Sequence, residues 1–280
     1  MKSTNDMGTI HIDGGLVKYI TENATYYVKE NFAPSIQVFR EEVPASKRKG
    51  IPETFFSNGP VERIVSLLGA GRCNVVSVKL AADMGLCEDE KIQLTEAVGP
   101  DFYFSRATED YRPEDLPLQD PEMAAGYQVV LDTIVRNWDD GERNMRIVNG
   151  IPVWFDFGAS LDPRHQSVYR FVMKLEEARN LGRVSTIVTY FMDYSRRKSQ
   201  ILKRAINTFS SVSNLEVRTI VSVSQVKIPA FFGEYLSNNI SQVTEDIDII
   251  RGAFLRENVL TRQHFMGLSV GRPKESLPSE

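Results

Sequence analysis

The sequence predicts an α+β fold in two parts, a small β-rich N-terminal lobe followed by a mostly helical C-terminal lobe. Three observations predict it. Short β-prone runs separated by turn residues come first, segments with apolar residues at helical spacing follow residue 120, and a polar stretch containing proline joins them. The predicted units are residues 1–105, residues 106–270 and a tail at 271–280, where two prolines and no apolar pattern predict disorder.

Composition limits the class of protein. At 280 residues the chain can bury a large core, and 42% apolar with 25% charged residues is ordinary for a globular protein. A net charge of -4 argues against non-specific nucleic-acid binding. No apolar run approaches the roughly 18 residues that a membrane span needs. With no apolar signal core after Met1, and only Cys73 and Cys87 as cysteines, we expect a cytoplasmic protein.

Three short runs near the N-terminus predict strands, because each is β-prone and is bounded by Gly, Asp or Asn: Thr9 to Ile12, Leu16 to Ile20 and Thr25 to Lys29. Lys29 ends the third run. Taken alone it reads as an exposed lysine at a strand end, so its role depends on the motif further along the chain.

The stretch between these strands and residue 120 is mixed in character. An irregular segment with three prolines and the basic run Lys47-Arg48-Lys49 predicts a surface insertion, and a helix, two strands and a linker are expected after it. In order, these are Phe32 to Asn58, Cys73 to Leu86, Ile92 to Val98, Phe102 to Phe104, and Arg106 to Gln119.

A helix is predicted to begin at Asp120 and Pro121, since a capping carboxylate followed by proline is a common helix start. Five apolar residues fall close to one face of it: Tyr127, Leu131, Ile134, Val135 and Trp138. That face should pack into the C-terminal lobe and deliver the segment that follows.

That segment, from Asn137 to Leu161, reads NWDDGERNMRIVNGIPVWFDFGASL. Two β-prone runs, Met145 to Val148 and Ile151 to Phe155, flank Asn149-Gly150, which is the strongest short-range signal for a type I′ hairpin. A tight hairpin returns the chain to its start. Asp156 should therefore lie beside the loop that carries Asp139 and Asn144.

An Asp, an Asn about five residues later, and an Asp-Phe-Gly run are the parts that kinase-type phosphoryl transfer requires. We assign Asp139 as the base that accepts the substrate hydroxyl proton, and Asn144 and Asp156 as Mg²⁺ ligands, since hard cations prefer oxygen donors. Lys29, on the third strand, is then the candidate for binding the ATP phosphates. The alternative is that Asp140-Gly141 is only a solvated turn and Phe157-Gly158 only a strand end.

The remainder of the chain predicts helices. Ser167 to Leu181 should be helical, with Val168, Phe171, Val172 and Leu175 facing inward. Two further apolar stripes follow, the first Ile201, Ala205, Ile206 and Phe209, the second Ile240, Val243, Ile247, Ile250 and Phe254.

The segment from Asn137 to Asn144 resembles the N-x-D-D-H-x-R-N catalytic loop of HipA-like kinases, and Phe155 to Ala159 resembles their I-D-H/F-G-A metal motif. Looser resemblances cover the third strand, the helix before Leu86 and a late segment: Tyr26 to Lys29, Asn74 to Leu86, and Val226 to Phe232. The same parts are similar to those of phosphatidylinositol 3- and 4-kinases. The resemblance implies a two-lobed protein-kinase-like fold that uses ATP and Mg²⁺.

Two positions depart from the family pattern. Gly141 stands where the family has His, and Asn74 stands where it has the glutamate that pairs with the strand lysine. Glu62 and Glu42 are the candidates to replace that glutamate, and if neither does, Lys29 is less well positioned.

The resemblance implies a Ser/Thr acceptor on a protein, with the kinase itself among the candidates. It also implies a bacterial toxin–antitoxin setting with an antitoxin-like regulatory partner. Two alternatives stay open. One is a lipid kinase of the phosphatidylinositol type, and the other is a pseudokinase that binds nucleotide or a partner without transfer.

Overall fold

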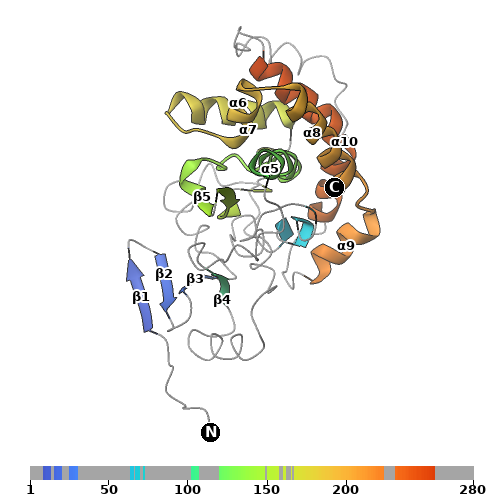
Figure 1. Ribbon diagram of the computed structural model, residues 1–280. Helices are drawn as coiled ribbons and strands as arrows, with labels where there is room; N and C mark the ends of the chain where they lie inside the picture. The colour runs from blue at the N-terminus through green and yellow to red at the C-terminus, as the bar shows by residue number, and fades with distance from the viewer. Residues whose placement is uncertain are drawn as a thin grey trace, which may run out of the picture.

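The computed structural model describes residues 9–13, 16–20, 25–30, 64–65, 67–69, 72, 102–106, 120–148, 150–157, 160–161, 165, 167–223 and 231–255. Strands come first along the chain, and after residue 120 come α5, one short hairpin at the edge of the helical part, and the remaining helices (Figure 1). This segregation of strands and helices is that of an α+β chain, as predicted. The two-lobed arrangement and the boundary at residue 105 stay predictions.

The N-terminal strands form one antiparallel sheet in the order β1-β2-β3-β4, with β1 Thr9–Asp13, β2 Leu16–Ile20, β3 Thr25–Glu30 and β4 Phe102–Arg106. All four strands were predicted, to within two residues at their ends. Lys29 lies opposite Tyr103 in the register of β3 and β4.

Several predicted features lie outside the described residues. They are the insertion Phe32 to Asn58, the helix Cys73 to Leu86 with Asn74, the strand Ile92 to Val98, the linker 107–119, the segment 226–230 and the tail 271–280, together with Glu42 and Glu62. Between the insertion and the predicted helix Cys73 to Leu86, residues 64–65 and 67–69 are helical in conformation. Ile64, Val65 and Leu68 are fully buried in the same apolar cluster as the C-terminal helices.

Helix α5, Pro121–Val135, is the central element of the helical part (Figure 1). It begins as predicted, because the Asp120 side chain accepts hydrogen bonds from the backbone N–H groups of Glu122 and Met123. Nearly all of its residues from Ala124 onward are buried, polar Gln128, Asp132 and Thr133 included. A helix buried all round needs neighbours on several sides.

Those neighbours are mostly C-terminal helices: α6 Val168–Asn180, α7 Thr186–Met192, α8 Arg196–Ser210, α9 Asn214–Val223 and α10 Phe231–Leu255. α5 packs directly against α7, α8 and α10 and against one strand of the hairpin. The predicted inward residues of α6 are buried, and so are those of α10 and, except for half-buried Ile206, those of α8.

Helix α10 packs against each of the helices α5 to α9. Two of its polar side chains reach the end of α5. Asn239 Nδ2 donates to the Ile134 carbonyl at 2.7 Å, and Asp246 Oδ2 lies 2.6 Å from Arg136 Nη2 in a buried ion pair. The Asn239 contact satisfies a carbonyl that a helix C-terminus leaves without a partner, and the ion pair neutralises the buried guanidinium. In the part of the chain that the structure describes, no helix combines the length and apolarity that crossing a bilayer requires.

Candidate active site

The loop after α5 is anchored by Asn137. Arg136 turns left-handed (φ 55°), and the Asn137 side chain then donates from Nδ2 to Asp132 Oδ1 at 3.0 Å. Asn137 Oδ1 accepts from the backbone N–H of Asp139 at 3.2 Å. One buried amide thus ties the backbone of Asp139 to a carboxyl on α5.

Asp139 and Asn144 are held together across the loop. Asn144 Nδ2 donates to the Asp139 carbonyl at 2.7 Å, and the Asn144 N–H donates to Gly141 O at 2.9 Å, which closes the short 3-10 helix η4, Glu142–Asn144. Because the nitrogen of the Asn144 amide is engaged by the loop, its oxygen is the atom suited to a cation. The two carboxylate oxygens of Asp139 lie 2.5 and 2.6 Å from Nη2 of Arg143.

The predicted hairpin is confirmed, with β5 Met145–Val148 paired to β6 Ile151–Trp154. Gly150 has φ +81°, which suits the predicted turn, and Asn149 lies outside the described residues. β6 ends one residue earlier than expected. The N–H of Phe155 donates to Asn144 O at 3.0 Å, and Asp156 then turns left-handed with φ 60°.

The hairpin therefore returns the exposed Asp156 to the end of β5 that Asn144 precedes. A Mg²⁺ site of this class takes only one or two protein oxygens and completes its shell with phosphate and water oxygens. Asn144 and Asp156 fit that donor set chemically. Within the described ranges, no three side chains of His, Cys, Asp or Glu gather in a way that could hold a metal.

Lys29 lies on β3. Its contact with ATP phosphates, the base role of Asp139 and the ligand roles of Asn144 and Asp156 stay predictions.

Asp140 is the residue that sequence reasoning missed, and the interpretation of Asp140-Gly141 as a solvated turn is wrong. Asp140 is 1% exposed. Its Oδ2 accepts from Ser185 Oγ at 3.1 Å and from the backbone N–H of Ile187 at 3.2 Å, while its carbonyl accepts from Thr186 Oγ1 at 2.9 Å. The candidate catalytic loop is thereby fixed to the start of α7. The sequence feature that could have indicated the burial of Asp140 is Ser185-Thr186, a helix start whose free N–H groups need an acceptor.

Burial changes the acidity of two carboxyls behind the loop. It raises the pKa of Asp140 to about 6. The hydrogen bonds from Ser185 and Ile187 act in the opposite direction and lower that pKa. Burial, with repulsion from Asp140, raises the pKa of Asp132 well above its ordinary value.

Gly141 has a packing reason in this chain. It forms an isolated antiparallel bridge with Ser185, and a Cβ at position 141 would lie 3.0 Å from the Val184 carbonyl oxygen. A histidine at this position would need that backbone to shift. The departure from the HipA-like pattern therefore matches the close approach of the loop to α7.

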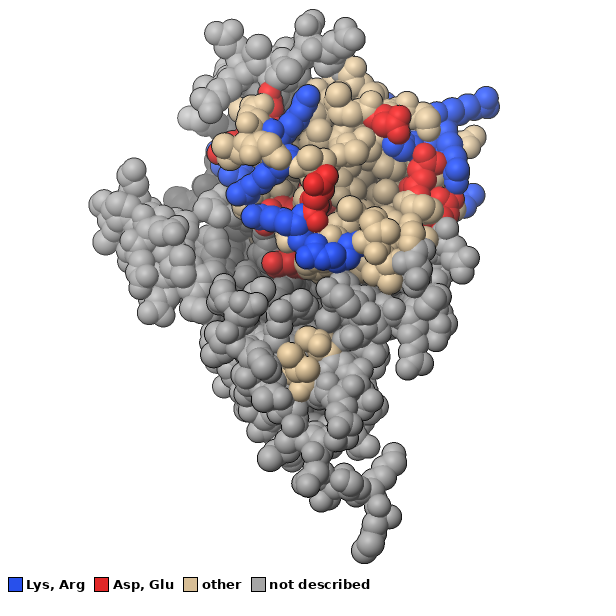
Figure 2. Space-filling model, turned by 60° about the vertical axis from the view of Figure 1, so that its left-hand side comes forward, with Lys and Arg blue, Asp and Glu red and all other residues tan. Residues whose placement is uncertain are grey.

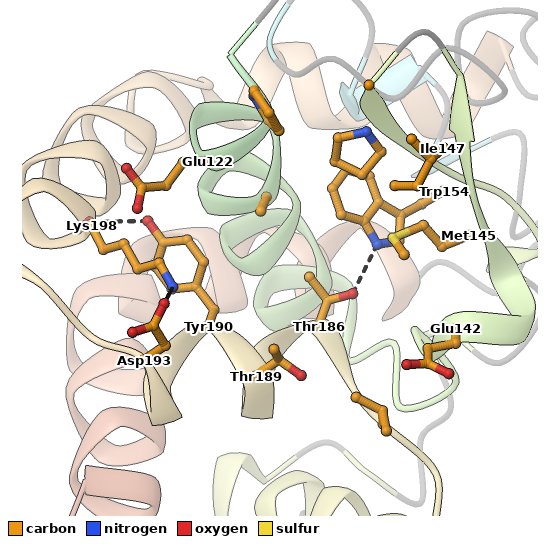
Figure 3. Close-up of a pocket in the computed structure, with 15 residues that line it drawn as sticks. Glu122, Glu142, Met145, Ile147, Trp154, Thr186, Thr189, Tyr190, Asp193 and Lys198 are labelled. Carbon is orange, nitrogen blue, oxygen red and sulfur yellow. Dashed lines mark hydrogen bonds and ion pairs between the residues drawn. The ribbon is translucent and has the colours of Figure 1, made fainter.

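A cavity of about 480 Å³ lies on the other side of the hairpin, between β5, β6, the start of α5 and α7 (Figure 3). Trp154 lines it and donates from Nε1 to Thr186 Oγ1 at 2.8 Å. Thr186 also holds the loop at Asp140, so the cavity wall and the candidate catalytic loop share a residue.

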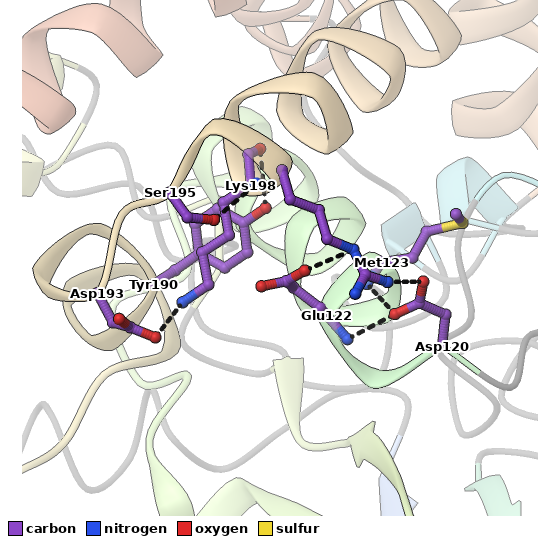
Figure 4. Close-up of polar contacts among 8 residues, drawn as sticks. Asp120, Glu122, Met123, Tyr190, Asp193, Ser195 and Lys198 are labelled. Carbon is purple, nitrogen blue, oxygen red and sulfur yellow. Dashed lines mark hydrogen bonds and ion pairs between the residues drawn. The ribbon is translucent and has the colours of Figure 1, made fainter.

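Ion pairs fix the wall of this cavity that α5 and α8 form. Asp120 and Glu122 lie 2.6 and 2.8 Å from Arg197, and Lys198 Nζ lies 3.1 Å from Asp193 (Figure 4). The Tyr190 hydroxyl donates to the Lys198 carbonyl at 3.1 Å, and burial raises its pKa. On the face that Figure 2 presents, cationic, acidic and uncharged side chains of the described residues are interspersed.

Comparison with known proteins gives a structural likeness and no sequence match. No protein-family model matches the chain, and no curated protein matches it. Among solved structures, the chain is similar to the Helicobacter pylori proinflammatory kinase CtkA, with 13% identity and a TM-score of 0.41, over 95% of this chain and 100% of that one. At this identity and TM-score the likeness establishes neither a family nor a function, and the function has to be argued from the site residues.

Proposed function

We propose that this chain is a kinase that transfers the γ-phosphate of ATP, with Mg²⁺, to a Ser or Thr hydroxyl of a protein. The observation that carries the proposal is the closure of the loop from Asp139 to Asn144. A side-chain hydrogen bond joins its two ends, and the hydrogen bond from Phe155 N–H to Asn144 O brings the next residue, Asp156, to the same place. A base and two oxygen ligands on one closed loop and one hairpin are the parts that phosphoryl transfer requires.

Each residue then has a distinct role. Asp139 accepts the proton of the acceptor hydroxyl, Asn144 and Asp156 supply oxygen ligands, and Lys29 binds phosphate oxygens. Mg²⁺, when bound, supplies neutralising charge to the phosphate oxygens. In this proposal the sheet β1–β4 belongs to an N-terminal lobe that covers the nucleotide, and an antitoxin-like protein regulates the enzyme.

The ion pair between Arg143 and Asp139 bears on whether the base is available. Arg143 is 55% exposed, and exposed pairs contribute about 0.2–1 kcal/mol. Opening the pair therefore costs little, so an incoming hydroxyl can replace the guanidinium. If the pair stays closed, both carboxylate oxygens are occupied and the chain binds nucleotide without transfer, which is the pseudokinase alternative.

Phosphoryl transfer from γ-labelled ATP with Mg²⁺, into the protein itself and into proteins of a lysate, tests the proposal. We expect Asp139→Asn and Asp156→Asn each to reduce transfer by about 10² or more, because each removes an interaction made at the reacting groups. Asp248→Asn, an exposed carboxylate on α10, is the matched control and should leave transfer unchanged.

Two results would contradict the assignment. Equal transfer by the wild type and both site variants would exclude Asp139 and Asp156 from the reaction. ATP binding without transfer by any of the proteins would support the pseudokinase instead.

A further inference from the structure

The cavity behind the hairpin has an apolar wall that the strand register creates. Met145 pairs with Trp154, and Ile147 pairs with Pro152. Alternate residues of a strand share a face, so these four side chains lie on one face of the hairpin, and all four line the cavity (Figure 3). The first turns of α5 and α7 form the opposite wall. The result is a largely apolar hollow of about 480 Å³, a size typical of ligand pockets.

The mouth of this cavity is also apolar. Ile147 is 62% exposed and Val184 46% exposed, and both line the cavity. Among the described residues six large apolar side chains are exposed, and two of the other four, Leu181 and Met192, lie at the ends of α6 and α7. Exposed apolar side chains at the mouth of a pocket are typical of a surface that binds another chain.

The charges that line the cavity are unbalanced. Three carboxylates, Glu122, Glu142 and Asp193, face one ammonium group, that of Lys198. Glu122 and Asp193 are paired, with Arg197 at 2.8 Å and Lys198 at 3.1 Å. Glu142 is exposed and makes no ion pair with any residue that the structure describes. The complementary ligand therefore carries a positive charge beside apolar groups.

We propose that this cavity docks a segment of the acceptor protein, one that carries two large apolar side chains and an adjacent Lys or Arg. The inference rests on the proposed function and names its substrate class as a polypeptide. Glu142 joins the two features, since it lines the cavity and lies within the candidate catalytic loop between Asp139 and Asn144. A chain anchored by its cation at Glu142 is held next to the site of transfer, which raises the local concentration of its hydroxyl groups.

Binding is tested first, without ATP. The probe is an array of ten-residue peptides with Leu, Ile or Phe at two positions and Lys or Arg beside them, together with a matched array in which Glu replaces the basic residue. We expect the basic array to bind and the acidic array not to bind. Trp154 in the cavity wall gives a fluorescence readout, which a Trp138→Phe background isolates because the chain has two tryptophans.

Three variants make the binding test specific. Ile147→Ser should weaken the best peptide roughly tenfold, because it removes an apolar contact at the mouth. Leu215→Ser is the matched control, since Leu215 is a 74% exposed apolar residue on α9, away from the cavity, and its loss should change nothing. Glu142→Lys should transfer the preference from the basic to the acidic array.

Equal binding of both arrays, absence of binding, or binding unaffected by Ile147→Ser would each overturn the proposal. So would a dimer of the wild-type chain that Ile147→Ser dissociates, because a second copy would then occupy this face.

The second step separates the docking inference from the proposed function. Joining the best peptide to a Ser-containing acceptor should lower KM about tenfold with kcat unchanged, and Ile147→Ser should abolish that gain. Transfer to the joined and the bare acceptor with equal KM would overturn docking and leave the kinase assignment intact. Peptide binding with no transfer to any acceptor would overturn the kinase assignment and, with it, the identity of the docked chain as an acceptor.

Discussion

The carboxyl group of Asp140 holds the candidate catalytic loop against the start of α7. It receives two hydrogen bonds from that helix start, and its other oxygen is buried without a hydrogen-bond partner among the described residues. A buried carboxylate satisfied on one side only carries a desolvation penalty, which the raised pKa expresses. The loop is therefore positioned by a group whose charged form costs folding free energy.

The pH dependence of stability follows from this. In the unfolded chain Asp140 loses its proton near its ordinary pKa of 3.8, whereas in the folded protein it keeps the proton up to about pH 6. The folded state binds more protons between these values, so Asp140 should make the free energy of unfolding fall as pH rises, by about 2 kcal/mol between pH 4 and 6. Denaturant unfolding at a series of pH values measures it.

Asp140→Asn should make that curve shallower, because the neutral amide keeps an acceptor oxygen and has no proton to lose. Asp132, whose pKa burial also raises, keeps the remaining slope. Asp193→Asn, at a side chain that is 92% exposed, should keep the slope of the wild type. An unchanged slope in Asp140→Asn would show that another group is responsible.

At the scale of the elements, α5 packs closely against α7 and α8 at Gly126. Gly126 allows it, since a Cβ there would clash with Ile201 Cγ2 of α8 and lie 2.8 Å from Tyr190 Oη of α7. Both neighbours are buried, and neither a β-branched side chain nor a phenol ring yields easily. The glycine sets the distance between three helices.

We therefore expect Gly126→Ala to lower the free energy of unfolding by about 1–3 kcal/mol through overpacking. Gly252→Ala is the control, because nothing lies within 4 Å of a Cβ at that position of α10. Alanine there should be neutral or stabilise the protein by up to about 1 kcal/mol. Chemical denaturation of the two variants measures the difference, and equal effects would contradict the packing argument.

The elements that the sequence predicted are those that local chemistry determines. Asp120 and Pro121 determine where α5 starts, and Asn149-Gly150 determines the turn of the hairpin. Each of these residues lies within a few residues of the feature that it determines. The burial of Asp140 was missed because its partners Ser185 and Ile187 are 45 and 47 residues away in sequence. Periodicity carries no information about such contacts.

At the scale of the whole molecule, one buried ion pair joins the end of α5 to the last described helix. Arg136 and Asp246 are 110 residues apart in sequence, and their side chains are 1% and 6% exposed. Arg136 Nη1 also donates to the Thr133 carbonyl. A pair of this kind specifies the position of α10 more than it adds net stability, but breaking it leaves a buried charge.

Asp246→Ala should therefore lower the free energy of unfolding by about 3–5 kcal/mol, because the guanidinium loses its counter-charge inside the protein. Asp248→Ala, two residues later, breaks only the exposed pair with Arg251 and should change it by about 0.5 kcal/mol or less. Thermal or denaturant unfolding compares them. Similar losses in both variants would mean that the burial of the Arg136 pair has no energetic consequence.

The place of α10 also sets an order of events during synthesis. α5 leaves the ribosome well before α10, and at roughly 5 to 20 residues per second the interval is on the order of ten seconds. During that time the side of α5 that α10 will cover remains open, and Arg136 has no Asp246. The nascent chain therefore exposes apolar surface and an unpaired cation together. We expect chaperones to bind this surface until α10, Phe231–Leu255, has left the ribosome and covers it.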